Sequence, residues 1–111
     1  MIEIVIKQFL DGHLSVPSFL ERPKETPERF VLFEKTGSGE RNHLPSSTFA
    51  FQSYGPSMYE AAKLNEEVKT AVKAMIAIDE INKIKLNSDY NFTDTTTKEY
   101  RYQAVFDIHH Y

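Results

Sequence analysis

Segment 57–77 constrains the fold of this chain most, because it combines a helix-start signal with a long helical repeat of apolar residues. Ser57 follows Pro56, and Glu60 comes three residues later. This spacing is typical of a capping box, in which Ser57 accepts from the Glu60 backbone N–H and the Glu60 carboxylate reaches back to Ser57. The repeat consists of Ala61, Leu64, Val68, Ala71, Val72 and Met75. The pattern predicts an amphipathic helix roughly 30 Å long, at about 1.5 Å per residue.

The polar face of this helix carries both signs of charge. It consists of Lys63, Glu66, Glu67, Thr70 and Lys73. A helix that binds a membrane surface usually has a basic polar face and a bulkier apolar face than this one. We therefore expect the helix to pack on a β-sheet formed by the segments on both sides of it.

Composition limits the class of protein. The chain has 111 residues, 41% hydrophobic and 13% aromatic, which is enough for the core of a single domain over residues 1–111. Its interspersed charges sum to −3, so we expect no sequence-specific nucleic-acid partner. The lack of cysteine excludes disulfides and thiolate metal sites and favours the cytoplasm. The short apolar N-terminal run contains Glu3 and Lys7, so we expect no signal peptide, membrane span or membrane partner.

The remaining periodicity predicts one more helix and five strands. Apolar residues at helical spacing predict a short helix over residues 2–11, although the alternation in IEIVI also allows a strand. Strands are predicted at residues 15–20, 29–36, 47–54, 81–86 and 100–109. The first contains Pro17 and suits a sheet edge. The order α–β–β–β–α–β–β predicts the α+β class, with a mainly antiparallel sheet flanked by one long and one short helix.

Two of the predicted strands differ in how their faces are used. The last one alternates, with Tyr100, Tyr102, Ala104, Phe106 and Ile108 on one face and Arg101, Gln103, Asp107 and His109 on the other, Val105 being the exception. The strand at 29–36 instead has apolar residues on both faces, among them Phe30 and Val31. Either the N-terminal helix covers this additional apolar surface or another subunit does.

The four histidines do not form a convincing metal site. His109 and His110 are neighbours on a strand and point to opposite faces. His13 follows the end of the predicted N-terminal helix, His43 lies in a polar loop, and none of the spacings is that of metal ligands. We expect no metal, no cofactor and no catalytic residue.

Two further groups have weak chemical interpretations. Gly37-Ser38-Gly39 is more typical of a hairpin turn than of a phosphate-binding loop, because no Gly-Lys-Ser/Thr follows. Asp89, Asp94 and the threonines at 95–97 could serve a small enzyme together with a histidine, and this function stays an alternative. Asp and Thr are also ordinary loop residues, since their side chains bond to nearby backbone groups.

Two polar segments, 37–46 and 87–98, are predicted to be long loops. The first contains Arg41 and His43, and the second contains Tyr90 and Phe92. Long loops in a small domain are usually functional or mobile, and Tyr, Phe and Arg are enriched at protein interfaces. These segments therefore favour a role in binding another protein.

Three blocks follow one another in the chain: PERFVLFEKTGSGERNHL (27–44), QSYGPSMYEAAKLNEEVKTAV (52–72) and KLNSDYNFTDTTTKEYRYQAVFDI (85–108). In their order and in the chain length, they resemble the small tail terminator, or tail completion, proteins of long-tailed bacteriophages and of prophages in Gram-positive bacteria. With the N-terminal helix, the blocks span nearly the whole chain. No single block is a diagnostic motif.

The resemblance implies a sheet flanked by helices and a structural role without catalysis or cofactor. Such proteins form a ring, usually six-fold, at the end of the tail tube, where the ring ends tube polymerisation and offers a docking surface for the filled head. The implied partners are other copies of the chain, the major tail tube protein and a head–neck connector protein. The implied location is the neck end of the virion tail, after synthesis in the host cytoplasm.

Carried over to this sequence, the loops at 37–44 and 87–98 are the candidate contact regions. The candidate interface residues are Arg41, Asn42, His43, Tyr90 and Phe92. A head-closure or connector component of the phage neck would share the ring and is an alternative, as is a binding module that stays monomeric.

Overall fold

A computed structural model describes the backbone of residues 1–111 and their side chains, except the side chain of Arg41. The helices are α1 (Ile2–His13) and α2 (Met58–Ala74), which a 3₁₀ turn η1 (Met75–Ala77) extends. The strands are β1 (Ser18–Phe19), β2 (Phe30–Arg41), β3 (Leu44–Gly55), β4 (Ile81–Asn91) and β5 (Tyr100–His110). The predicted α+β class and element order are confirmed.

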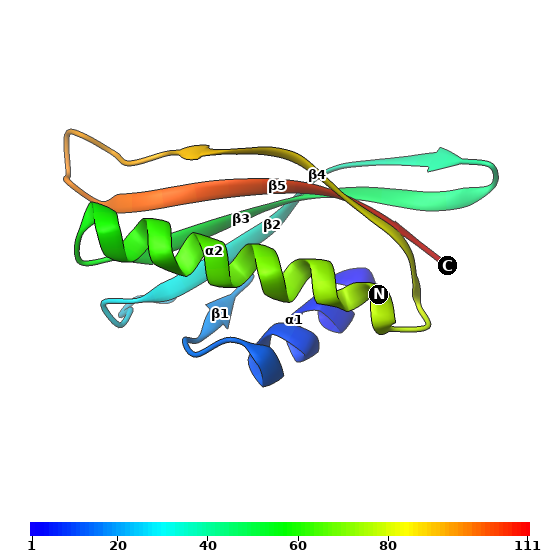
Figure 1. Cartoon of the computed structure of the whole chain (residues 1–111), viewed down its shortest axis with the longest axis horizontal. Coiled ribbons are helices and arrows are strands. Elements are labelled where there is room, and N and C mark those ends of the chain that lie inside the picture. Colours follow the sequence, from blue (N-terminus) through cyan, green and yellow to red (C-terminus); the bar gives the residue numbers. More distant parts are fainter.

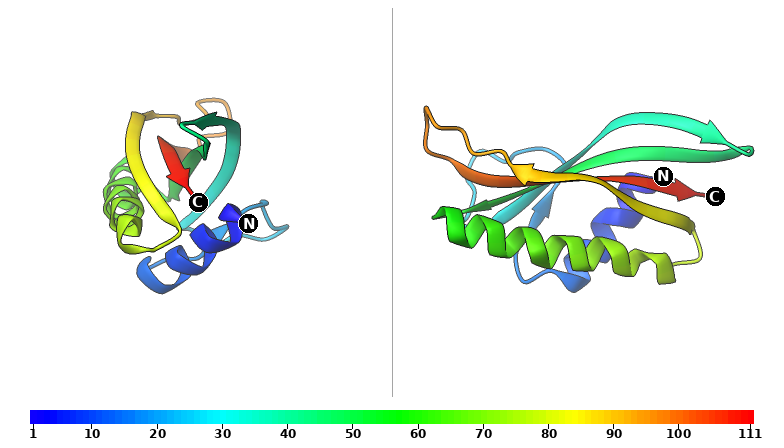
Figure 2. Two further views of the ribbon diagram at one scale, coloured as in Figure 1. Left: turned by 90° about the vertical axis from the view of Figure 1, so that its right-hand side faces the viewer. Right: turned by 45° about the horizontal axis from the view of Figure 1, so that its top comes forward.

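The five strands form one twisted sheet in the order β1-β2-β3-β5-β4. β1 runs parallel to β2, and the β2–β3, β3–β5 and β4–β5 pairs are antiparallel. Both helices pack on the same face of the sheet, as Figures 1 and 2 show from three directions. We call the other face, which the helices leave uncovered, the open face.

The helix α2 begins as its sequence predicts. Ser57 is extended (φ −146°, ψ 165°), and its hydroxyl accepts from the Glu60 backbone N–H at 3.1 Å. The second half of the predicted capping box is wrong, because the Glu60 carboxylate instead accepts from Arg29 Nε at 3.0 Å. This hydrogen bond holds the pKa of Glu60 below its usual value. The N-terminus of α2 is thereby tied to the start of β2 as well as capped.

The core lies between the helices and the sheet. Four phenylalanines at its centre are fully buried: Phe33, Phe49, Phe51 and Phe106. The predicted apolar stripe of α2 packs on them, and Ile2, Ile6 and Leu10 of α1 complete the same cluster. The face predicted for the last strand is confirmed at Ala104, Phe106 and Ile108, which are buried.

The predicted loop at 37–46 is wrong. β2 continues to Arg41 and β3 begins at Leu44, so that a two-residue turn, Asn42-His43, closes a long hairpin. Both turn residues have positive φ, 53° and 68°. A two-residue hairpin turn of type I′ requires positive φ at both positions, and its twist matches that of the strands. The described glycines of the chain, Gly37 and Gly39 among them, do not have positive φ, so the turn predicted at 37–39 is also wrong.

Two other boundaries differ from the prediction. β1 covers only Ser18 and Phe19 of the predicted strand at 15–20. β4 runs to Asn91, so residues 87–91 of the predicted second loop are strand, and a shorter connection leads from there to β5. Within this connection, Asp94 forms a bridge with Glu99, and Lys98 has a φ of 58°.

Candidate interaction surface

The open face brings polar and aromatic side chains from four strands into rows. Leu32, Gln52, Gln103 and Tyr90 form one row across β2, β3, β5 and β4. Gln52 Nε2 donates to Gln103 Oε1 at 2.8 Å, and Gln103 Nε2 donates to the Tyr90 hydroxyl. A hydrogen-bonded chain of side chains therefore runs across the middle of the open face.

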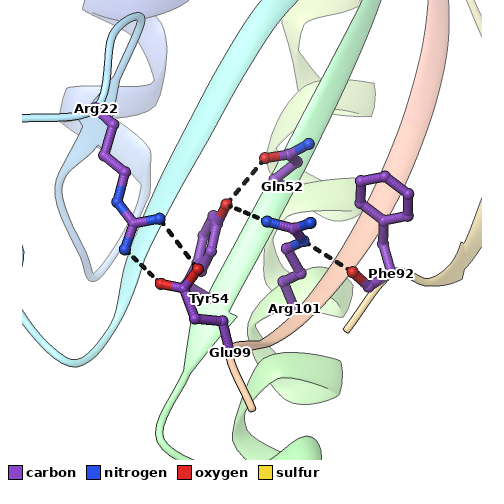
Figure 3. A network of polar contacts seen from close by, with 6 residues as sticks. All are labelled: Arg22, Gln52, Tyr54, Phe92, Glu99 and Arg101. Carbon is purple, nitrogen blue, oxygen red and sulfur yellow. Dashed lines mark hydrogen bonds and ion pairs between the residues drawn. The ribbon is translucent and has the colours of Figure 1, made fainter. Parts of the chain in front are cut away.

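The next row consists of Phe30, Tyr54 and Arg101, which pair across β2, β3 and β5 with Tyr54 in the centre. Figure 3 shows Tyr54 and Arg101 of this row. The hydroxyl of Tyr54 donates to Gln52 Oε1 at 3.1 Å and accepts from Arg101 Nη1 at 3.0 Å. Its ring stacks on Phe30 with centroids 4.4 Å apart, and only 4% of the residue is exposed. Tyr54 thus joins an aromatic pair to the polar row beside it.

A surface segment explains why Phe30 and Tyr54 are buried. We call residues 20–29, between β1 and β2, the strap. Arg22 of the strap places its guanidinium 5.6 Å from the Phe30 ring centre and 5.3 Å from that of Tyr54. Arg22 also forms an ion pair with Glu99, just before β5 (Figure 3). Part of the apolar surface predicted to need a helix or a subunit is therefore covered by the strap.

The Arg22–Glu99 pair shifts the pKa of both groups. The hydrogen bond with Glu99 raises the pKa of Arg22, and the same bond lowers the pKa of Glu99. Both side chains are about a third or more exposed, so the pair contributes at most about 1 kcal/mol. It fixes the position of the strap more than it stabilises the fold.

The Arg22–Glu99 ion pair leads to a prediction about stability at low pH. The pKa of Glu99 is lower in the folded state than in the unfolded state, where it is about 4.3. The contribution of Glu99 to the free energy of unfolding is therefore present above the unfolded pKa and is lost as pH falls through the folded-state pKa. We expect the free energy of unfolding to fall less between pH 5 and pH 3 in Glu99→Gln than in the parent, by up to about 1 kcal/mol. Urea unfolding followed by tyrosine fluorescence measures this difference. Glu28→Gln, on the exposed part of the same strap, is the control and should follow the parent; equal slopes in all three proteins would contradict the assignment.

The predicted residues Tyr90 and Phe92 lie together beside this network. Their rings meet edge to face at 5.9 Å, and 41% of Tyr90 and 39% of Phe92 are exposed. The Arg101 guanidinium lies 4.7 Å from the Phe92 ring centre, and its Nε donates to the Phe92 carbonyl at 2.8 Å. Sequence reasoning missed Arg101 as a member of this site, although its place on the polar face of the last strand was predicted.

The other predicted residues lie at the opposite end of the molecule. Asn42 and His43 are exposed in the hairpin turn, while the side chain of Arg41 lies outside the described part. From Leu44 beside that turn to Gln52 in the Tyr90 row, β3 spans eight residues, roughly 27 Å at about 3.4 Å per residue. The predicted interface residues therefore lie in two separate places, the Asn42-His43 turn and the open face near Tyr90 and Phe92. We define the open-face cluster as Tyr90, Phe92 and Arg101.

The carboxylates considered for catalysis serve local structure. Asp89 points to the helix side, where it accepts from Asn65 Nδ2 at 2.7 Å and pairs with Lys69. The hydrogen bond with Asp89 is the main cause of the raised pKa of Lys69. Asp94 accepts from the Thr96 backbone N–H at 2.9 Å, and this bond lowers the pKa of Asp94.

The described histidines contact groups other than these carboxylates. His13 stacks on Phe9 with centroids 3.8 Å apart and lines a hollow between the helices. His110 contacts Ser47 Oγ at 3.1 Å, while its neighbour His109 lines a hollow with Lys83 and Lys85. Among the side chains that the structure describes, no group of three or more His, Asp or Glu could hold a metal ion.

No protein-family model matches the chain, and no curated protein matches it significantly. Over the described residues, neither helix is long and apolar enough to span a bilayer.

Proposed function

We propose that this chain is a structural protein of a phage virion, which forms a ring at the end of the tail tube, ends tube polymerisation and provides the surface on which the head docks. The observation that carries the proposal is the open-face cluster. Tyr90 lies on β4 and Phe92 directly follows that strand, and their rings are large, partly exposed and in edge-to-face contact. The backbone N–H of Phe92 donates to the Arg101 carbonyl at 2.9 Å, and the Arg101 guanidinium lies against the Phe92 ring. Tyr, Phe and Arg in such a setting are typical of a protein-binding surface.

The placement of the helices supports the same role. Since α1 packs beside α2, it leaves the open face uncovered, and a subunit or tube protein can bind there. The resemblance in the three sequence blocks supplies the identity of the partners, namely other copies of the chain, the major tail tube protein and the head–neck connector protein.

Capping of tail tubes tests the proposal. The protein is added to growing tubes of the major tail tube protein from the phage or prophage that encodes it, and tube lengths and tube ends are measured by electron microscopy. We expect shorter tubes with a ring of added density at one end. Tubes of unchanged length, without bound protein at either end, would contradict the proposal.

A matched pair of variants links this activity to the open face. Tyr90→Ala should leave the fold intact and weaken ring formation or capping, because it removes an exposed interface ring. Tyr59→Ala is the control, since Tyr59 is 71% exposed but lies in the first turn of α2. Equal capping by both variants and the parent would remove the open-face cluster from the interface.

A further inference from the structure

The two sides of the sheet end in backbone edges that have no strand partner. β4 is an outer strand of 11 residues and pairs on one side only, with β5, within the described chain. On the other side, β1 pairs only with Val31 and Leu32, so residues 33–41 of β2 are unpaired on their outer edge in the part that the structure describes. Unpaired N–H and C=O groups along such edges are a template for another strand.

The two edges match in direction. β2, β3, β5 and β4 alternate in direction, so β4 runs antiparallel to β2. When copies stand side by side with their strands in the same orientation, β4 of one copy meets β2 of the next in the antiparallel sense. Figure 2 shows the two strands at opposite margins of the sheet.

The two edges, of β4 and of β2, also match in their position along the strand direction. Lys85 on β4 pairs with Asp107 on β5. Asp107 pairs in turn with Thr48 on β3, and Thr48 with Gly37 on β2. The first half of β4 therefore lies level with residues within the unpaired stretch 33–41 of β2, beyond Val31 and Leu32, which pair with β1.

Charge favours pairing between different edges over pairing between identical ones. Lys83 and Lys85 are exposed on β4, and they lie level with Gly39 and Gly37 of β2. Two β4 edges in contact would bring lysines together, which is unfavourable across neighbouring strands. β4 against β2 at this level places the lysines opposite glycines, with Glu34 of β2 on the same face of the sheet as Lys85. Edge lysines ordinarily discourage strand addition, and here they select the partner edge.

We propose that the outer edge of β4 pairs antiparallel with the unpaired edge of β2, residues 33–41, of a second copy of this chain. This head-to-tail contact uses two different surfaces, so repeated contacts close into a ring or continue as a filament, depending on the rotation. Closure of these contacts into a ring rests on the proposed function. The pairing of the two edges does not, and it is tested separately.

Cross-linking tests the pairing directly, because the chain has no cysteine of its own. Gly37→Cys is on the β2 edge, where an added Cβ has no described atom within 4 Å, and Asn87→Cys is exposed on β4. With a short bis-maleimide at the highest soluble concentration, we expect a ladder of covalent multimers from the double variant. Each single variant should stay monomeric on a denaturing gel, and a mixture of the two should give dimers only.

The outcomes separate this inference from the proposed function. Dimers from one single variant alone would show contact between identical edges and would overturn the inference. A double variant that light scattering shows to be multimeric, but that does not cross-link, would overturn the edge pairing and leave the ring standing. A ladder without a largest member would support the pairing and contradict a closed ring, and monomers throughout would overturn the pairing.

Reversal of charge is a second test, read as the dissociation constant in sedimentation experiments. Lys85→Glu should weaken self-association roughly fivefold, and adding Glu34→Lys should restore it. Lys63→Glu, on the exposed side of α2, changes net charge equally and should have no such effect. Equal weakening by both lysine variants would overturn the assigned edge contact.

Discussion

Replacing Phe51 by alanine is expected to lower the free energy of unfolding by about 3–5 kcal/mol, a large part of the total for a domain of this size. Phe51 is fully buried, and its ring lies 5.6 Å from that of Phe33 and 5.9 Å from that of Phe106. The strands that hold these rings are fixed by the β2–β3 and β3–β5 ladders, so they cannot close the cavity fully.

Urea unfolding measures this effect, with two variants for comparison. Phe51→Leu should lose less than half as much, because most of the apolar volume stays. Phe92→Ala should lose about 1 kcal/mol or less, since that ring is partly exposed. A Phe51→Ala protein no less stable than Phe92→Ala would contradict the position assigned to the core.

Gly55→Ala is expected to destabilise the protein by about 1–3 kcal/mol or more, although only one methyl group is added. A Cβ at Gly55 would lie 2.7 Å from the backbone nitrogen of Ala61 and 3.0 Å from the carbonyl carbon of Glu60. These are backbone atoms of the first turn of α2, so the helix start has to move away from β3 to make room.

Gly37→Ala is the matched control for this prediction. Gly37 is also a strand glycine, but an added Cβ meets no described atom within 4 Å. Its free energy of unfolding should stay the same or rise by up to about 1 kcal/mol, because alanine restricts the unfolded chain. Equal effects of the two substitutions would show that α2 does not approach β3 at Gly55 as closely as described.

Local sequence signals predicted the elements whose cause is local. The Ser57 cap and the apolar repeat from Ala61 to Met75 define α2 and the start of η1 without help from other segments. The alternation from Tyr100 to Ile108 defines β5, because one of its faces packs on the core. In both cases, burial of one face imposes a period on the sequence.

The end of the β2–β3 hairpin was not predicted, because β2 does not bury one of its faces there. Residues 34–40 are exposed on both faces of β2, so they carry no alternation. The Gly and Ser residues in this run then indicate a loop, although the backbone is held by its ladder to β3. The turn itself is Asn-His, without the glycine that usually marks such a turn.

The open-face network was beyond sequence reasoning for a different reason. Arg22, Tyr54 and Glu99 come from segments far apart in the chain, and only the strand order brings them together. Tyr90 and Phe92 were selected as exposed aromatic residues, which the structure bears out. Their separation from Asn42 and His43 depends on strand lengths that the sequence did not show.

The native mass in solution tests most directly the central claim that this chain assembles with copies of itself. Light scattering on a sizing column, over a series of concentrations, should show one discrete species near six times the 12.9 kDa of the monomer, in equilibrium with monomer at low concentration. A mass that stays at 12.9 kDa up to the highest soluble concentration would contradict the claim.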